Sequence, residues 1–204
     1  MTALGRFERV DDLHDANLRG RRAGFRGGAK IGISLTPVNP APAAVRRLLP
    51  GEAEAYRAIR LEALATNPEA FGSTWEEQAA QPLDRFAETL AKAAIFGAFL
   101  DGDLVGMAGF FIEEGARKRH KGVLRGMYVR PAARGADLGR ALLRAVLGYA
   151  RAHVEQVQLL VVSDNEAARR LYESEGFSAY GLEREALKDG ERYLDEILMV
   201  RFLK

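Results

Sequence analysis

The sequence of 204 residues contains no cysteine and only three histidines. Without thiols, the chain cannot form disulfides, thiolate zinc sites, iron–sulfur clusters or a cysteine nucleophile. His14, His120 and His153 are scattered along the chain, which argues against a histidine-rich metal site. We therefore expect chemistry that needs no metal.

Long apolar runs and a strong charge bias are missing as well. The longest apolar stretch, residues 93–100, is less than half as long as a membrane span. The first residues lack the charged, then apolar, then small-residue order of a secretory signal. The formal net charge of +2 is too small to indicate nucleic acid as a partner. These absences predict a soluble, cytoplasmic protein with no membrane partner.

What is present is the composition of an ordinary globular protein, with 48% hydrophobic and 28% charged residues. At roughly 150 residues per domain, the length suggests one domain and an appendage. Residues 1–43 are rich in glycine, proline and arginine and poor in large apolar side chains. We predict that they form a disordered leader and linker, although their basic residues would also fit an RNA-binding or membrane-surface arm. Residues 44–204 would then form the functional domain.

Segments of strand and helix character alternate from residue 44 onward. Apolar runs bounded by turn residues predict strands, and amphipathic stretches predict helices. The expected strands are 45–49, 95–100, 104–111, 123–129, 157–162, 177–187 and 193–203, and the expected helices are 52–65, 82–93, 134–153 and 165–175. This alternation predicts one α/β domain.

One strand-to-helix junction, residues 128–143 (YVRPAARGADLGRALL), could hold a phosphate. The loop carries Arg134 and Gly135, and Gly139 lies near the first turn of the helix. Free backbone N–H groups at the positive end of a helix bind anions, and Arg134 and Arg140 add positive charge. The same residues also fit an ordinary junction without a ligand. The stretch is neither a Walker A loop nor a three-glycine dinucleotide fingerprint.

A second helix start, residues 161–177 (VVSDNEAARRLYESEGF), combines capping residues with an aromatic side chain. Ser163 and Glu166 have the spacing of a capping box, and Asp164 and Asn165 are alternative N-caps. Tyr172 follows Asn165 by nearly two turns, so both can face one side of the helix. Taken alone, Tyr172 fits a core aromatic residue with its hydroxyl in water at least as well as a functional group.

Together the two stretches resemble the GNAT family of N-acetyltransferases. The residues Arg134-Gly-Ala-Asp-Leu-Gly139 are similar to its acetyl-CoA loop, Gln/Arg-x-x-Gly-x-Gly/Ala. Asn165, Ala168, Leu171, Tyr172, Gly176 and Phe177 match its second motif, on the helix after the fifth strand. The resemblance extends over about residues 44–204. It implies a mixed, twisted α/β sheet of six to seven strands, with about four helices on both faces and strands 4 and 5 splayed apart.

The resemblance also implies an activity and a role for each motif residue. The activity would be direct transfer of an acetyl group from acetyl-CoA, as co-substrate, to a small-molecule amine, a lysine or a protein N-terminus in a ternary complex. Tyr172 would be the general acid that protonates the leaving thiolate. The residues that would contact the co-substrate are Met127, Tyr128, Val129, Arg134, Gly135, Ala136, Asp137, Leu138, Gly139, Arg140, Asn165 and Ala168.

Three features leave questions open within this interpretation. Asp137 replaces the usual middle glycine of the loop, and its carboxylate would repel a pyrophosphate, so we expect weakened acetyl-CoA binding. The strand at 123–129 has no carboxylate for a general base, which leaves Glu113 and Glu114 as the nearest candidates in the sequence. Phe71 and Trp75 would wall the acceptor pocket or, alternatively, act as hydrophobic anchors.

Other classes of protein remain compatible with the sequence. A non-catalytic acyl-CoA-binding module would keep both motifs, and a nucleic-acid-binding protein would depend on the basic leader. The acceptor amine and the assembly state, including a homodimer, are not determined by any motif.

Overall fold

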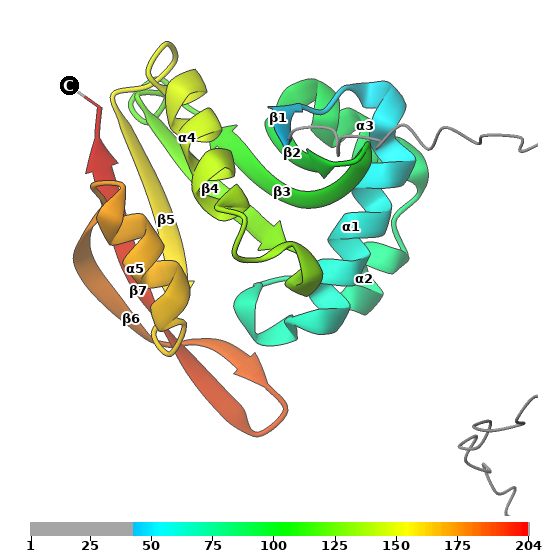
Figure 1. Cartoon of the computed structure of the whole chain (residues 1–204). Helices are drawn as coiled ribbons and strands as arrows, with labels where there is room; N and C mark the ends of the chain where they lie inside the picture. Colours follow the sequence, from blue (N-terminus) through cyan, green and yellow to red (C-terminus); the bar gives the residue numbers. More distant parts are fainter. Residues whose placement is uncertain (1–42, 204) are drawn as a thin grey trace, which may run out of the picture. The chain divides into compact units, whose positions relative to one another are not determined.

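The computed structural model describes residues 43–203, which form a seven-stranded sheet with the order β1-β2-β3-β4-β5-β7-β6 (Figure 1). The leader predicted for residues 1–43 thus lies, except for its last residue, outside the described residues. The strands are β1 (Ala44–Arg47), β2 (Ala94–Leu100), β3 (Asp103–Ile112), β4 (Lys121–Val129), β5 (Gln156–Val162), β6 (Ser178–Asp189) and β7 (Arg192–Phe202).

Five α-helices and three short 3-10 turns connect the strands within residues 43–203. The helices are α1 (Ala53–Thr66), α2 (Trp75–Ala79), α3 (Leu83–Lys92), α4 (Leu138–Ala150) and α5 (Glu166–Ser174), and the turns are η1 (Pro50–Glu52), η2 (Pro68–Ala70) and η3 (Pro131–Ala133). All seven strands and the four longer helices confirm the sequence-based prediction. The additional helix, α2, is five residues long and begins at a capping box between Thr74 and Glu77.

Helix α4 begins four residues later than its amphipathic pattern predicts. Gly135 has a φ of +88° and Asp137 a φ of +55°, so the chain cannot be helical between Arg134 and Asp137. These residues are polar or small and exposed and their backbone forms a loop, and the buried apolar stripe begins at Leu138. This loop exposes the first turn of the helix.

Helices cover both faces of the sheet (Figure 1). Helices α1 and α3 pack on one face through a cluster that includes Ile59, Leu90 and Met107. On the other face, α4 and α5 pack through a larger cluster, whose central members Leu142 and Val146 are fully buried. Burying one such side chain stabilises a fold by about 1.5–3 kcal/mol, so the amphipathic stripe of α4 accounts for its position.

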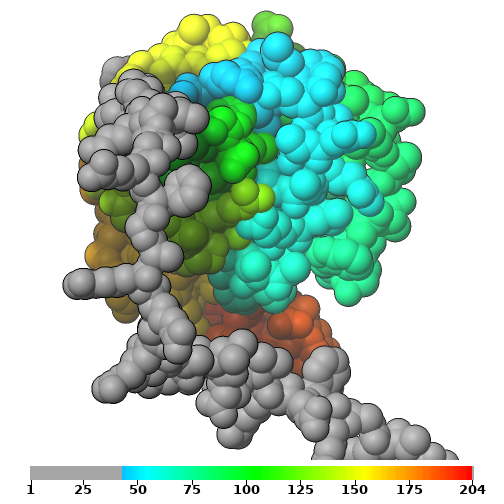
Figure 2. All heavy atoms as spheres, turned by 45° about the vertical axis from the view of Figure 1, so that its right-hand side comes forward, coloured from blue at the N-terminus to red at the C-terminus, as the bar shows by residue number. Residues whose placement is uncertain are grey.

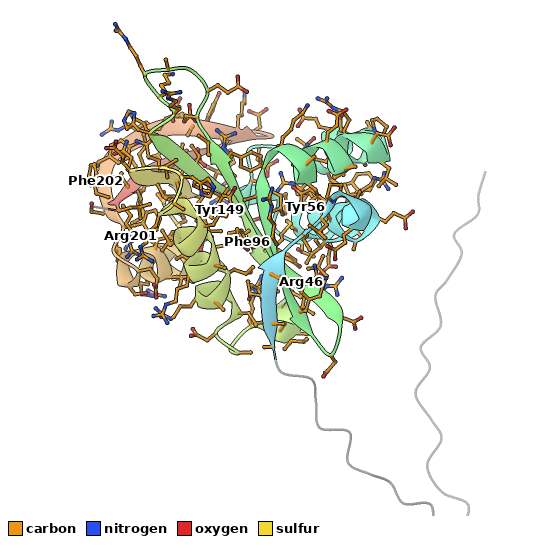
Figure 3. All side chains as sticks on the ribbon, turned by 90° about the horizontal axis from the view of Figure 1, so that it is seen from above. Arg46, Tyr56, Phe96, Tyr149, Arg201 and Phe202 are labelled. Carbon is orange, nitrogen blue, oxygen red and sulfur yellow. The ribbon has the colours of Figure 1, made fainter. Side chains whose placement is uncertain are left out.

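The C-terminal end of α4 is held by aromatic contacts. Tyr149 lies beside Phe96, with ring centres 6.0 Å apart (Figure 3), and meets Phe110 edge-on at 5.9 Å. These contacts hold α4 against β2 and β3 at the end opposite its N-terminus. Among the helices of the described part of the chain, none combines the length and the apolar character that a membrane span requires.

Strands β4 and β5 run parallel but separate after a short paired segment. Only Lys121, Gly122 and Val123 of β4 pair with β5, opposite Gln156, Val157 and Gln158. From Leu124 onward the two strands diverge, as Figure 1 shows. The expected splay of the fourth and fifth strands is confirmed, and it leaves one edge of β4 unpaired.

Candidate active site

A cavity of about 620 Å³ lies where β4 and β5 diverge. Its walls come from η2, β4, the start of α4, β5, α5 and the first residues of β7. Figures 1 and 2 show the β6–β7 hairpin reaching below the η2 segment. The lining residues used below are Glu69, Phe71, Arg125, Gly126, Met127, Tyr128, Val129, Arg134, Gly139, Asp164, Asn165, Ala168, Tyr172 and Arg192.

The start of α4 provides unpaired backbone donors at one end of this cavity. The Ala141 N–H donates to the Asp137 carbonyl as the first helical hydrogen bond, so the N–H groups of Leu138, Gly139 and Arg140 have no intrahelical acceptor. Gly139 itself lines the cavity. These donors and the positive end of the helix dipole suit an anion such as a pyrophosphate.

Two of the predicted loop residues are placed differently. The Leu138 side chain is 3% exposed and belongs to the core, so only its backbone can contact a ligand. Asp137 is the N-cap of α4 in the left-handed region, and its side chain caps no N–H group. The Asp137 carboxylate instead accepts a hydrogen bond from Arg140 Nε at 3.2 Å.

The two arginines of the loop have different partners. Arg134 lines the cavity and donates to the Val129 carbonyl at 3.1 Å and to Asn67 Oδ1 at 3.3 Å. The Arg140 guanidinium lies against the end of α5, where Nη1 pairs with Glu175 at 2.7 Å. Arg134 is therefore placed to add charge to a bound anion, whereas Arg140 can contribute its backbone N–H.

The free edge of β4 presents two backbone amides to the gap. Alternate residues of a strand direct their backbone groups to opposite sides. The Arg130 N–H donates to the Val105 carbonyl beyond the end of β3, so the Tyr128 N–H faces β3 as well. The N–H groups of Met127 and Val129 consequently face β5 and can pair with an extended amide chain.

Asn165 lies across the gap from these amides, at the N-cap of α5. Its Oδ1 accepts a hydrogen bond from the Ala168 N–H at 3.1 Å, as a capping residue does. Its side-chain NH₂ group has no partner within residues 43–203 and can donate to a ligand. Of the capping residues that the sequence left open, Asn165 is the one that caps the helix.

Tyr172 is buried in the cavity wall, with only 8% of its surface exposed. Its hydroxyl contacts the Met127 thioether sulfur at 3.6 Å, a weak acceptor. Burial raises the pKa of Tyr172 to about 12, so the phenol keeps its proton at neutral pH. The hydroxyl can therefore donate to a stronger acceptor that enters the cavity.

The remaining predicted residues are divided between the cavity and its surroundings. Phe71 lines the cavity, whereas Trp75 begins α2, is 44% exposed and does not line it. Glu113 and Glu114 follow β3 outside the cavity, and Glu114 lines a second cavity of about 490 Å³ beside α3. The structure therefore brings neither carboxylate to Tyr172.

Several charged residues line the cavity that the sequence analysis did not assign to a ligand site. The carboxylates that line the cavity belong to Glu69 and Asp164, and Asp164 pairs with Arg192 at 3.3 Å. Arg125 interrupts the apolar strand β4 and faces α1 and α3, since its guanidinium lies 5.8 Å from the centre of the Phe111 ring. The signal in the sequence that could have identified Arg125 is its charge within an otherwise hydrophobic strand.

A hydrogen-bonded network connects α1 to the end of β4 next to the cavity. Arg130 forms a two-nitrogen ion pair with Glu62 of α1, with Nη2 2.8 Å from Oε2. The hydroxyl of Tyr128 donates to the same carboxylate at 3.1 Å. Arg130 lowers the pKa of Glu62, and the Tyr128 hydrogen bond adds to this effect. The network fixes the C-terminal end of α1, and with it η2, against β4.

Comparisons with known proteins agree with this geometry. Residues 56–177 match the Acetyltransferase (GNAT) family. A match over more than half of the chain shows that this protein belongs to the GNAT family of acetyltransferases, and it confirms the resemblance found in the motifs.

Individual relatives extend the comparison. The chain is 42% identical over 88 residues to the N-alpha-acetyltransferase RimI of Mycobacterium tuberculosis, which covers 43% of this chain and 54% of that protein. It is 34% identical over 147 residues to a mycothiol acetyltransferase of Streptomyces scabiei, covering 71% of this chain and 46% of that one. The chain thus spans about half the length of the curated relatives it matches.

A solved structure shows the same fold. A putative acetyltransferase from Salmonella typhimurium, determined with its cofactor acetyl-CoA, superposes with a TM-score of 0.71 at 21% identity. The superposition covers 80% of this chain and 95% of that one.

Proposed function

We propose that this protein is an acetyl-CoA-dependent N-acetyltransferase that transfers an acetyl group directly to an amine in a ternary complex. The observation that carries the proposal is that one cavity joins the free N–H groups of α4, the open edge of β4 and the Tyr172 hydroxyl. Membership of the GNAT family and the similarity to named acetyltransferases support it.

The residues present fit acetyl-CoA. The N–H groups at Gly135 to Arg140 and the Arg134 guanidinium would hold its pyrophosphate. Met127, Val129, Asn165 and Ala168 would contact the pantetheine amides in the gap. The pantetheine arm would lie along the unpaired edge of β4 and extend the sheet, as an added strand does.

When bound, acetyl-CoA supplies an acetyl thioester, whose C–S bond breaks as the amine nitrogen forms a C–N bond. Tyr172 would donate its hydroxyl proton, or a hydrogen bond, to the departing sulfur. The N–H of Met127 would stabilise the negative charge that develops on the carbonyl oxygen.

A base must also receive the proton that the amine loses, and a carboxylate in the cavity can act as one. Glu113 and Glu114 do not line the cavity, and Asp164 is paired with Arg192. We therefore assign this role to Glu69, acting directly or through a water molecule.

The direct test is release of free CoA from acetyl-CoA by purified protein with a panel of amines. The panel should contain amino acids, polyamines, amine-bearing antibiotics and peptides with free N-termini. We expect at least one amine to accelerate release above the rate without amine. A protein that binds acetyl-CoA but releases no CoA with any of these amines would instead be a non-catalytic acyl-CoA-binding module.

We also propose that the protein works in the cytoplasm, that its partner is a small-molecule or peptide amine, and that nucleic acid is not a partner. The net charge of +2 supports the last point. The exposed apolar side chains of Tyr180, Leu182 and Tyr193 on β6 and β7 would support a homodimer. Light scattering of the purified protein tests the assembly.

A further inference from the structure

Arg60 of α1 is a partly buried cation without a partner. It belongs to the helix face that packs on the sheet, together with Tyr56, Ile59 and Ala63. Its Nη1 atom is buried and has no hydrogen-bond partner within residues 43–203, and its side chain forms none of the ion pairs found there. Burial also lowers the pKa of the Arg60 guanidinium. Because an unpaired buried cation destabilises a fold, its position calls for an anion.

The guanidinium of Arg60 lies directly behind the active-site cavity. Its central carbon is 4.9 Å from the centre of the Phe71 ring. Gly126 is also close to it, since an added Cβ there would lie 3.6 Å from Nη1. Phe71 and Gly126 both line the cavity. Because Gly126 has no side chain, the enclosed Nη1 atom lies close behind the cavity wall, and its positive charge can act on a ligand that binds there.

A second cation, Arg125, lies next to Gly126 on the same face of the sheet. Its side chain is exposed, lines the cavity and pairs with no carboxylate of the described part of the chain. The other two cavity arginines do have protein partners, since Arg134 donates to Asn67 and Arg192 pairs with Asp164. Two cations without a carboxylate partner therefore lie at the part of the cavity wall that includes Phe71, Arg125 and Gly126.

We propose that Arg60 and Arg125 form a carboxylate subsite, so that the acceptor is an amine that also carries a carboxylate. This inference rests on the proposed acetyltransferase function and specifies its substrate class. Arginine forms paired hydrogen bonds with carboxylates and stacks on aromatic rings, as Arg60 does on Phe71. The carboxylate can be that of a free amino acid or an acidic side chain beside the N-terminus of a peptide.

The test compares acceptors that differ only in the carboxylate. One arm sets free amino acids against their α-amides, and the other sets C-terminally amidated dipeptides ending in glutamate against those ending in glutamine. Amidation lowers the pKa of an amino acid's own amine, so the first arm is measured at pH 9. We expect kcat/KM to favour the carboxylate by at least about tenfold in one arm, which identifies its source.

The arginine variants show whether this subsite causes the preference. Arg60→Met and Arg125→Met should each reduce the preference about tenfold or more, and Arg60→Lys should restore part of it. Arg57→Met is the matched control, because Arg57 lies one turn earlier on α1, donates to the Ala79 carbonyl and contacts Phe86. A preference that is absent in both arms, or that survives both arginine variants, overturns the inference.

Binding provides a readout that is independent of turnover. Calorimetry on the CoA-bound protein would compare N-acetyl amino acids with N-acetyl amino acid amides as probes. If the N-acetyl amino acids bind more tightly than the amides and Arg125→Met removes this difference, the subsite is supported. This holds even if the protein acetylates no amine, and in that case only the proposed acetyltransferase function is contradicted. Equal affinity of both probes contradicts the subsite. Arg125 is exposed, so this variant should fold even if Arg60→Met does not.

Discussion

At the level of single residues, Tyr172 illustrates how burial determines what a side chain can do. The phenol is removed from water and contacts only the Met127 sulfur as an acceptor in the described structure. The resulting rise of its pKa to about 12 keeps the proton on oxygen. Such a group is a weaker acid than one titrating near neutrality, so we expect it to contribute mainly by hydrogen bonding to the developing thiolate.

Tyr172→Phe should lower kcat about 100-fold, at the low end of the range for general acids. KM for acetyl-CoA should change little, because the hydroxyl would act on the sulfur in the transition state. The shape of the pH–rate profile below pH 10 should be the same in both proteins, since Tyr172 does not ionise there. Unchanged turnover in the variant would contradict the acid role.

The same pKa shift predicts a difference in alkaline stability. A raised folded-state pKa means that the unfolded chain releases this proton first, so its stabilising effect is complete below pH 10 and is lost between pH 10 and about 12. The free energy of unfolding should therefore fall more steeply over this range in the wild type than in Tyr172→Phe. Denaturant titrations at a series of pH values measure it, and parallel curves would contradict the burial argument.

Asp137 has a left-handed backbone conformation, which is unfavourable for a residue with a side chain. Left-handed φ values cost a non-glycine residue about 1–2 kcal/mol, although aspartate tolerates them better than most. Asp137→Gly should stabilise the fold by up to about 1 kcal/mol and, by removing a carboxylate beside the α4 N-terminus, tighten acetyl-CoA binding several-fold. Calorimetry measures both the stability of the fold and the affinity for acetyl-CoA. The loss of the exposed contact with Arg140 should matter little.

Ala136→Gly is the control for Asp137→Gly. Ala136 is an exposed loop residue whose φ is not positive, so glycine there should only add unfolded-state entropy and destabilise. If both variants bind acetyl-CoA equally, loop flexibility rather than the carboxylate controls affinity.

Among the elements, the contact between α1 and the end of β4 connects two walls of the cavity, the strand β4 and the η2 segment that follows α1. Glu62 and Arg130 are 32% and 37% exposed, so solvent screens their attraction. Their importance lies in geometry, because Glu62 also accepts from Tyr128 and fixes the helix end that leads into η2.

Glu62→Gln should lower stability by only about 1 kcal/mol but raise KM for the acceptor, with a smaller effect on KM for acetyl-CoA. Displacement of η2, which carries Glu69 and precedes Phe71, is the physical reason. Steady-state kinetics with both substrates measures the two constants. Glu54→Gln, at an exposed position in the first turn of α1, is the control and should change neither.

Elements also show where local patterns mislead. The apolar stripe of α4 was enough to predict a helix and its buried face, but its start at Leu138 depends on left-handed backbone conformations at Gly135 and Asp137. Arg60 provides the opposite case, since the helix and its buried stripe were predictable from residues 52–65 whereas the unpaired guanidinium was not. Whether a charged side chain on the buried face of a helix has an ion-pair partner depends on the residues packed against it, and these are known only from the structure.

For the molecule as a whole, the separation of β4 from β5 is the decisive feature. Acetyl-CoA in the gap should slow amide hydrogen exchange at Met127, Val129 and residues 135–140. Exchange at Phe96 and Ala98 of β2, far from the gap in the sheet order, should not change. Exchange measured by mass spectrometry or NMR with and without acetyl-CoA tests this. Uniform protection of the whole sheet would indicate general stabilisation instead of binding in the gap.

Local sequence patterns were sufficient for the order of the strands along the chain, the presence of both motif-bearing helices and the family, because periodicity, capping and motif spacing are properties of neighbouring residues. They could not show that Glu113 and Glu114 lie outside the cavity, that Arg140 pairs with Glu175, or that the Arg60 guanidinium lies close to Gly126. Each of these depends on which segments, distant in sequence, the twist and divergence of the sheet bring together. The physical reason is that burial and charge pairing are set by partners far along the chain, and these partners are defined only once the sheet has formed.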